Sequence, residues 1–124
     1  MGRAPRPFFA WIASAAFAIG VLMTLSVGCT SPTLPLPPPT APSISVGTEP
    51  RTWNLRSTAG AQPNALIIAV NRNETLPRSE RVTGTIADEQ GSWELVIVGQ
   101  TGDFIDVSQE SGGASSAPTT VELR

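Results

Sequence analysis

The chain has 124 residues, which is room for one domain, and its formal net charge of -2 is too small to favour a nucleic-acid partner. It contains no histidine, lysine or tyrosine, so the usual general base, Schiff-base amine and phenolic acid are absent. Its single cysteine has no intramolecular partner for a disulfide. We therefore expect no enzyme activity and no cofactor.

Residues 1–28 have the layout of an export signal. The basic start "MGRAPRP" precedes an almost continuous apolar run from Phe8 to Gly28, and the small residue Gly28 closes that run. A run of this length is also long enough for a retained transmembrane helix. Both alternatives place the rest of the chain outside the cytoplasm, because the arginines stay on the inner side.

The junction "LSVGC" resembles the lipobox of bacterial lipoproteins, in which a small residue precedes an obligatory cysteine. The resemblance implies signal cleavage between Gly28 and Cys29 and a lipid-anchored (acylated, palmitate-bearing) Cys29 as the mature first residue. Thr30, which is not an aspartate, implies by the same resemblance sorting to the outer membrane. The expected location is therefore the cell envelope, with the membrane as a partner through the anchor.

Residues 29–42 are expected to form a proline-rich linker. The stretch "SPTLPLPPPTAP" has six prolines in twelve residues, and each proline fixes φ and removes an amide donor. Neither a helix nor a sheet ladder is expected there, so the sequence predicts an extended stalk of polyproline type.

Residues 43–124 are expected to form an all-β domain, a small sandwich of about six to seven strands. Short β-type runs alternate with turn residues, and none shows apolar residues at helical spacing. The predicted strands are residues 51–57, 65–71, 81–87, 92–98, 103–109 and 119–124. Gly91 and the stretch "GQTG" predict tight turns, so the third, fourth and fifth of these strands are expected to be joined by hairpins.

Strand parity predicts the core, because side chains alternate between the two faces of a strand. The apolar run "ALIIAV" is expected to be a central strand. The tryptophans share parity with aliphatic residues and are therefore expected to be buried. The predicted core residues are Trp53, Leu55, Val82, Ile86, Trp93, Leu95, Ile97, Ile105, Val107, Val121 and Leu123.

The stretch "VTGTIADEQGSWELVI" resembles a hairpin of bacterial Ig-like surface modules, and the likeness continues through "GDFIDVSQESGGASSAPTTVEL". The same residues resemble the prealbumin-like, carboxypeptidase regulatory-type sandwich almost as well. Both resemblances imply a β-sandwich that serves as a binding or spacing module without catalytic residues of its own.

Candidate site residues lie in the predicted loops. Asp88, Asp103 and Asp106 offer the oxygen ligands that calcium prefers, but no D-x-D-x-D-G loop is present, so we expect solvated carboxylates and no metal. Phe104 has parity opposite to Ile105, which makes it a candidate either for an exposed apolar contact or for packing under a loop. Arg72 and Arg78, in the polar loop of residues 71–80, are candidates for a partner-facing rim.

The sequence as a whole predicts a lipid-anchored envelope protein whose β-sandwich binds an envelope protein or a glycan. The alternative is a structural accessory or spacer subunit with no ligand of its own. An exposed, contiguous patch around Phe104 or the loop of residues 71–80 favours the binding module, whereas a uniformly polar sandwich favours the spacer.

Overall fold

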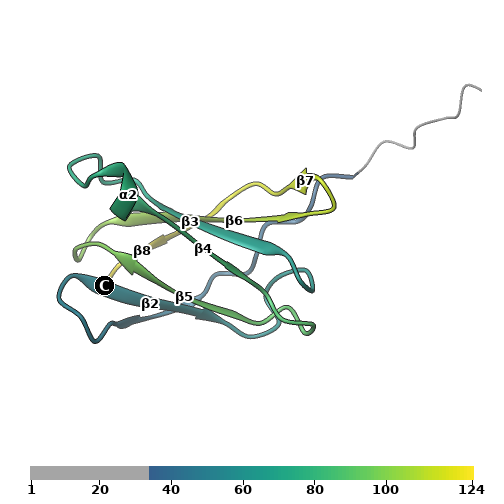
Figure 1. The fold of residues 1–124 in the computed structure, drawn as a ribbon, viewed down its shortest axis with the longest axis horizontal. Helices are drawn as coiled ribbons and strands as arrows, with labels where there is room; N and C mark the ends of the chain where they lie inside the picture. Colours follow the sequence, from purple (N-terminus) through teal and green to yellow (C-terminus); the bar gives the residue numbers. More distant parts are fainter. Residues whose placement is uncertain (1–33) are drawn as a thin grey trace, which may run out of the picture. The chain divides into compact units, whose positions relative to one another are not determined.

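The computed structural model describes residues 34–124, which form two antiparallel β-sheets packed face to face (Figure 1). The predicted all-β sandwich is therefore confirmed. The three-stranded sheet has the order β1-β2-β5, with β1 Ser43–Val46, β2 Thr52–Ser57 and β5 Trp93–Val98. The five-stranded sheet has the order β4-β3-β6, with β7 and β8 both paired to the remaining side of β6. Its strands are β3 Leu66–Asn71, β4 Val82–Ile86, β6 Phe104–Ser111, β7 Ala114–Ser115 and β8 Thr119–Glu122.

All six predicted strands are present, and three short elements were not predicted. These are β1, β7 and a four-residue helix, α2 (Arg78–Arg81). The helix follows Pro77, whose carbonyl accepts hydrogen bonds from the amides of Glu80 and Arg81, so part of the predicted polar loop is a single helical turn. Within residues 34–124, no helix has the length and apolar character needed to cross a membrane. The predicted export signal, with Gly28 and Cys29, lies outside the described residues.

The prediction of three hairpin-connected strands is wrong. β4 pairs with β3, β5 pairs with β2, and β6 pairs with β3, so the chain crosses between the sheets twice in succession. Gly91 does adopt a positive φ of 79°, as the turn chemistry required. A tight turn reverses the chain, but it does not determine whether the next strand pairs in the same sheet or crosses to the opposite one.

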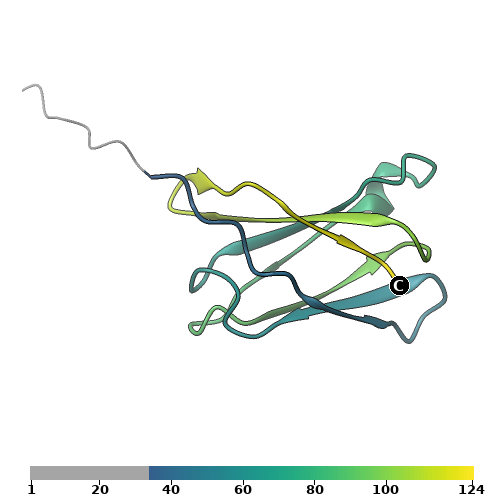
Figure 2. The ribbon, with the colours of Figure 1, turned by 180° about the vertical axis from the view of Figure 1, so that it is seen from behind.

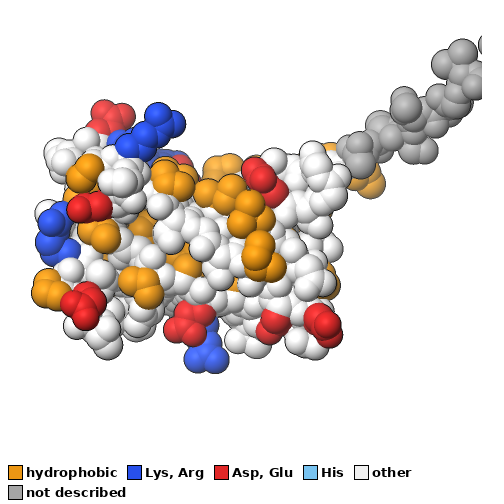
Figure 3. All heavy atoms as spheres, viewed as in Figure 1, with side chains coloured by type: hydrophobic (Ala, Val, Ile, Leu, Met, Phe, Trp, Pro, Cys, Tyr) orange, Lys and Arg blue, Asp and Glu red, His pale blue; other side chains and the backbone are white. Residues whose placement is uncertain are grey.

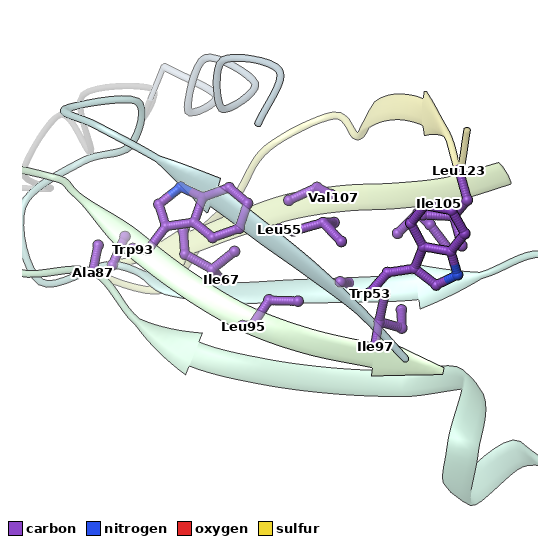
Figure 4. Packing of buried hydrophobic residues seen from close by; sticks show 12 residues of the cluster. Trp53, Leu55, Ile67, Ala87, Trp93, Leu95, Ile97, Ile105, Val107 and Leu123 are labelled. Carbon is purple, nitrogen blue, oxygen red and sulfur yellow. The ribbon is translucent and has the colours of Figure 1, made fainter. Parts of the chain in front are cut away.

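The core lies between the two sheets and is built from the inward-facing residues of both (Figure 4). Trp53 and Trp93 are 8% and 4% exposed, which confirms the prediction that both are buried. The indole Nε1 of Trp53 donates to the carbonyl of Gly99 at 3.1 Å, so its polar atom is satisfied inside the core. The other buried members of the cluster are Leu55, Ala65, Ile67, Ala69, Ala87, Leu95, Ile97, Ile105, Val107 and Leu123, and Val121 packs against them.

Two residues assigned to the core, Val82 and Ile86, are instead 44% and 61% exposed. The alternation along β4 was predicted correctly, but its faces were reversed. The register pairs Val70 with Val82 and Leu66 with Ile86, which places all four side chains on the outer face of the five-stranded sheet.

The end of the predicted linker packs against the sandwich. A segment before β1, residues 36–42, runs along one side of the two sheets (dark blue in Figure 2). Leu36 forms a parallel bridge with Ser116, and the amide of Thr40 donates to the carbonyl of Gly60 at 2.9 Å. Pro39 is fully buried. Residues 36–42 are therefore part of the folded unit, where the sequence predicted a free stalk.

Buried Gln109 holds this segment in place. Its side-chain Nε2 donates to the carbonyl of Pro37 at 2.7 Å, and its Oε1 accepts from the amide of Gln62 at 2.7 Å. Its backbone amide donates to the hydroxyl of Ser116 at 3.0 Å. Because both ends of the amide side chain are used, Gln109 is accommodated in the interior at 2% exposure.

Candidate interaction surface

The outer face of β3 and β4 carries a contiguous group of apolar side chains. The β3–β4 register places Leu66 beside Ile86, Ile68 beside Gly84, and Val70 beside Val82. The three β3 residues are half-buried by their neighbours, whereas Val82 and Ile86 are exposed. We call Leu66, Ile68, Val70, Val82 and Ile86 the apolar face. In Figure 3 hydrophobic side chains gather over the part of the molecule where β3 and β4 lie.

A polar cluster borders the apolar face at the Val70 end. The Arg72 Nε donates to Asp106 Oδ2 at 2.7 Å, and Thr120 donates from its hydroxyl to Asp106 Oδ1 at 2.6 Å. The hydrogen bond from Arg72 holds the pKa of Asp106 below its usual range, against the desolvation that raises it. Asp106, a weak calcium candidate in the sequence, therefore serves as the ion-pair partner of Arg72.

Phe104 lies on the same outer face, beyond this cluster. It is 48% exposed, so it does not pack under a loop, and it stands opposite Glu122 of β8. The Arg72–Asp106 pair separates it from the apolar face. Phe104 is therefore an isolated exposed apolar residue at one corner of the sheet.

Asp103 organises the loops at one end of the sandwich. Its Oδ2 accepts hydrogen bonds from the side-chain amide of buried Asn71 at 3.0 Å and from the Gln100 amide at 2.9 Å. Its Oδ1 accepts from the side chain of Asn73 at 3.0 Å. Desolvation raises the pKa of Asp103, but these hydrogen bonds together hold it below the usual range. Both carboxylate oxygens thus have partners within the protein.

Asp88 and Arg78 occupy separate places. The Asp88 Oδ1 accepts from the amides of Gln90 and Ser92, at 2.9 and 2.8 Å, which closes the turn between β4 and β5. Arg78 lies on the exposed helix α2. Across residues 34–124, no three histidine, cysteine, aspartate or glutamate side chains converge as metal ligands.

A shallow hollow of about 450 Å³ lies beside the start of β5. Its carboxylates, Asp88 and Glu94, come from the turn before β5 and from the outer face of that strand. Trp93 contributes to the wall, but its buried Nε1 makes no hydrogen bond. The remaining lining residues are Arg56, Ser57, Thr58, Ile86 and Ser92.

The two outer faces of the sandwich differ in polarity. On the three-stranded sheet the register places Thr52, Asn54 and Arg56 on the outer side, where Arg56 is opposite Glu94. Two valines of β5, Val96 at 52% exposed and the half-buried Val98, interrupt an otherwise polar surface. The apolar face therefore belongs to the five-stranded sheet alone. The sequence signal for it was the continuous apolar run of β3, which was interpreted only as a sign of a central strand.

No known family model, curated protein or solved structure matches this chain. The fold and surface described above are therefore the basis for the functional inference.

Acid should weaken the loop network around Asp103. Because the folded-state pKa of Asp103 lies below its ordinary value of 3.8, its stabilising contribution is present above that value and is lost as the pH falls through the folded-state pKa. We expect the difference in unfolding free energy between wild type and Asp103→Asn to be greatest near neutral pH and to shrink toward about pH 2. Urea unfolding at a series of pH values measures this difference.

Repeating the urea unfolding at high salt separates the effect of Asp103 from that of the exposed Arg72–Asp106 ion pair. Salt screens exposed charges much more than hydrogen bonds in a packed loop, so the Asp103 contribution should persist at high salt. A difference between wild type and Asp103→Asn that stays constant from neutral pH to about pH 2 would show that the charged form of Asp103 is not what the loops require.

Proposed function

We propose that this chain is a lipid-anchored protein of the bacterial cell envelope whose sandwich acts as an interaction module for another protein. The observation that carries the interaction role is the apolar face, a contiguous group of half-buried and exposed aliphatic side chains on one outer sheet surface. Patches of this kind with polar borders are typical of protein interaction sites. The resemblance of "LSVGC" to a lipobox supports the anchor at Cys29.

The strand order supports an Ig-like arrangement within the β-sandwich class. Ig-like sandwiches keep the first, second and fifth strands in one sheet and the third, sixth and seventh in the other. The orders β1-β2-β5 and β4-β3-β6-β8 share this division, but the fourth strand, which constant-type domains place beside the fifth, here lies beside the third. Antibody domains carry a tyrosine corner, an inter-sheet disulfide and a buried tryptophan on the third strand. This chain has no tyrosine and a single cysteine, and its buried tryptophans lie on β2 and β5.

The surface supports a protein partner better than a glycan. Sugar-binding surfaces commonly stack rings on exposed aromatic side chains. Both Trp53 and Trp93 are buried in the core, and the exposed Phe104 stands alone at one corner of the sheet. The apolar face consists of aliphatic residues, which match the buried centre of a protein interface. The same face favours the binding module over the spacer.

Site-specific photo-crosslinking tests the interaction role in the full chain in intact envelopes. A photoreactive residue at position 86, on the apolar face, should give an adduct with a second protein. The same residue at position 54, on the opposite outer surface, should give none. Val70→Lys should abolish the adduct from position 86, because it places a charge within the apolar face, beside Val82.

Equal adducts from positions 54 and 86, or an adduct unaffected by Val70→Lys, would contradict a specific contact on the apolar face. An adduct whose mass is only twice that of the chain would contradict a distinct protein partner and would indicate contact between two copies.

A further inference from the structure

β4 is an edge strand that lacks the usual protection against pairing. It has one neighbour, β3, so its other side presents free backbone groups. Natural edge strands commonly carry charged residues or proline that discourage pairing with another chain. The sequence of β4, "VTGTI", has neither. The other edges are protected: β5 contains Glu94, β8 contains Glu122, β1 directly follows Pro42, and β7 is only two residues long.

The sequence of β4 is also complementary to itself. If two copies pair in antiparallel fashion about a two-fold axis at Gly84, Val82 of one copy stands opposite Ile86 of the other. Thr83 then stands opposite Thr85, and Gly84 opposite Gly84. Apolar β-branched pairs and Thr–Thr pairs are favourable cross-strand neighbours. A two-fold axis requires this reciprocal arrangement, in which each contact occurs twice.

The flanking charges are complementary in the same arrangement. Arg78 and Arg81 lie in α2 just before β4, whereas Asp88 and Glu89 follow the strand. Antiparallel pairing places the arginine flank of one copy beside the acidic flank of the other. Among residues 34–124 the ion pair is Arg72–Asp106, so neither arginine of α2 has a carboxylate partner within this part of the chain.

We propose that two copies of this chain associate through antiparallel pairing of their β4 strands. The five-stranded sheets then form one continuous sheet across the two-fold axis, and the two apolar faces join on its outer surface. The contact is short, so the dimer should be weak, with a dissociation constant of about 10 to 1,000 µM. This inference goes beyond the proposed function, because it concerns the sheet edge and does not require another protein.

Sedimentation equilibrium of the full chain in detergent tests the pairing and its register. The double variant Val82→Lys with Ile86→Lys places lysines opposite each other across the axis and should weaken the dimer by more than about tenfold. The matched variant Val82→Lys with Ile86→Glu loses the same apolar side chains but places a lysine opposite a glutamate. It should associate about tenfold more tightly than the double-lysine variant.

Two single variants separate edge pairing from other contacts. Phe104→Lys changes the outer face away from the β4 edge, and Val46→Lys changes an exposed apolar residue on β1. Both should dimerise like wild type. Circular dichroism confirms that each variant retains the β fold before its association is measured.

A wild-type chain that stays monomeric up to about 1 mM, the upper end of the expected range of dissociation constants, would overturn the proposal. Equal dissociation constants for the two double variants would also overturn it, as would a Phe104→Lys effect as large as that of the double-lysine variant. None of these results bears on photo-crosslinking to a second protein, so failure of the dimer and failure of the proposed function are distinguishable.

Discussion

Replacing Gly91 with alanine should lower the free energy of unfolding by about 2 to 5 kcal/mol. Gly91 has a φ of 79°, a left-handed conformation that costs a residue with a Cβ atom about 1 to 2 kcal/mol. A Cβ at this position would also overlap the carbonyl oxygen of Ala61. Crowding of this kind adds about 1 to 3 kcal/mol when the surroundings cannot yield, and here the obstacle is backbone.

The overlap matters because the turn is fastened to the neighbouring loop. The amide of Ala61 donates to the carbonyl of Gly91 at 3.1 Å, and the amide of Gly91 donates to the carbonyl of Asp88 at 3.0 Å. Moving the turn away from Ala61 to make room for a methyl group would strain both hydrogen bonds. The turn also sets the point at which the chain leaves β4 and enters β5 in the opposite sheet.

Gly113→Ala is the matched control for this prediction. Gly113 also has a φ of 79°, but nothing lies within 4 Å of a Cβ built there. Gly113→Ala should therefore carry the conformational cost alone, about 1 to 2 kcal/mol. Urea unfolding of the full chain measures both variants. Equal losses would contradict the account of the Gly91 turn, since the close approach to Ala61 would then contribute nothing.

Strand positions were predictable because alternation in β-strands is a local property. The pattern of Trp93, Leu95 and Ile97 against Glu94 identifies both the strand and its buried face without knowledge of its neighbours. The same reasoning located β2 and β6. It failed to predict β1 and β7, which are only four and two residues long and offer too little sequence for a periodic signal.

The arrangement of the strands was less predictable because it depends on long-range pairing. Gly91 and Gly102 mark turns wherever they occur, whether the next strand pairs in the same sheet or crosses to the other. One face of β4 carries Val82 and Ile86, and the other carries Thr83 and Thr85. The prediction assigned the aliphatic face to the core. The structure places the threonines inward, so hydrophobicity alone gave the wrong face at an edge strand.

Buried polar residues were the other features that the sequence interpretation missed. Asn71 and Gln109 continue the inward parity of Ile67 and Ile105, respectively, so parity placed them in the core and their polarity argued against it. Each is accommodated because distant groups supply hydrogen-bond partners, the carbonyl of Val98 for Asn71 and that of Pro37 for Gln109. These partners lie far along the chain, which is why a local pattern could not reveal them.

The candidate site was predicted only in part. Of the two alternatives left open for Phe104, the structure shows the exposed one. Arg72 and Asp106 were chosen separately before the structure brought them together as an ion pair. The apolar face was missed, since Val82 and Ile86 had been assigned to the core. Its existence depends on the register between β3 and β4, which aligns five aliphatic residues on the side away from the core.

Cys29→Ser should abolish attachment of fatty acid to the chain. The proposed envelope role depends on an acylated Cys29, and each buried CH₂ group of an acyl chain contributes about 0.8 kcal/mol, so two or three chains make release from a membrane negligible. Serine is nearly the same size but lacks the thiol that receives the lipid. Ser31→Ala, a similar change two positions away, is the control and should leave acylation intact.

Metabolic labelling with a fatty-acid analogue, followed by mass spectrometry of the purified chain, tests this central claim most directly. The account predicts that wild type and Ser31→Ala begin at Cys29 and carry the label, whereas Cys29→Ser carries none. A wild-type chain that incorporates no fatty acid, or a Cys29→Ser variant that is labelled as strongly as wild type, would contradict it.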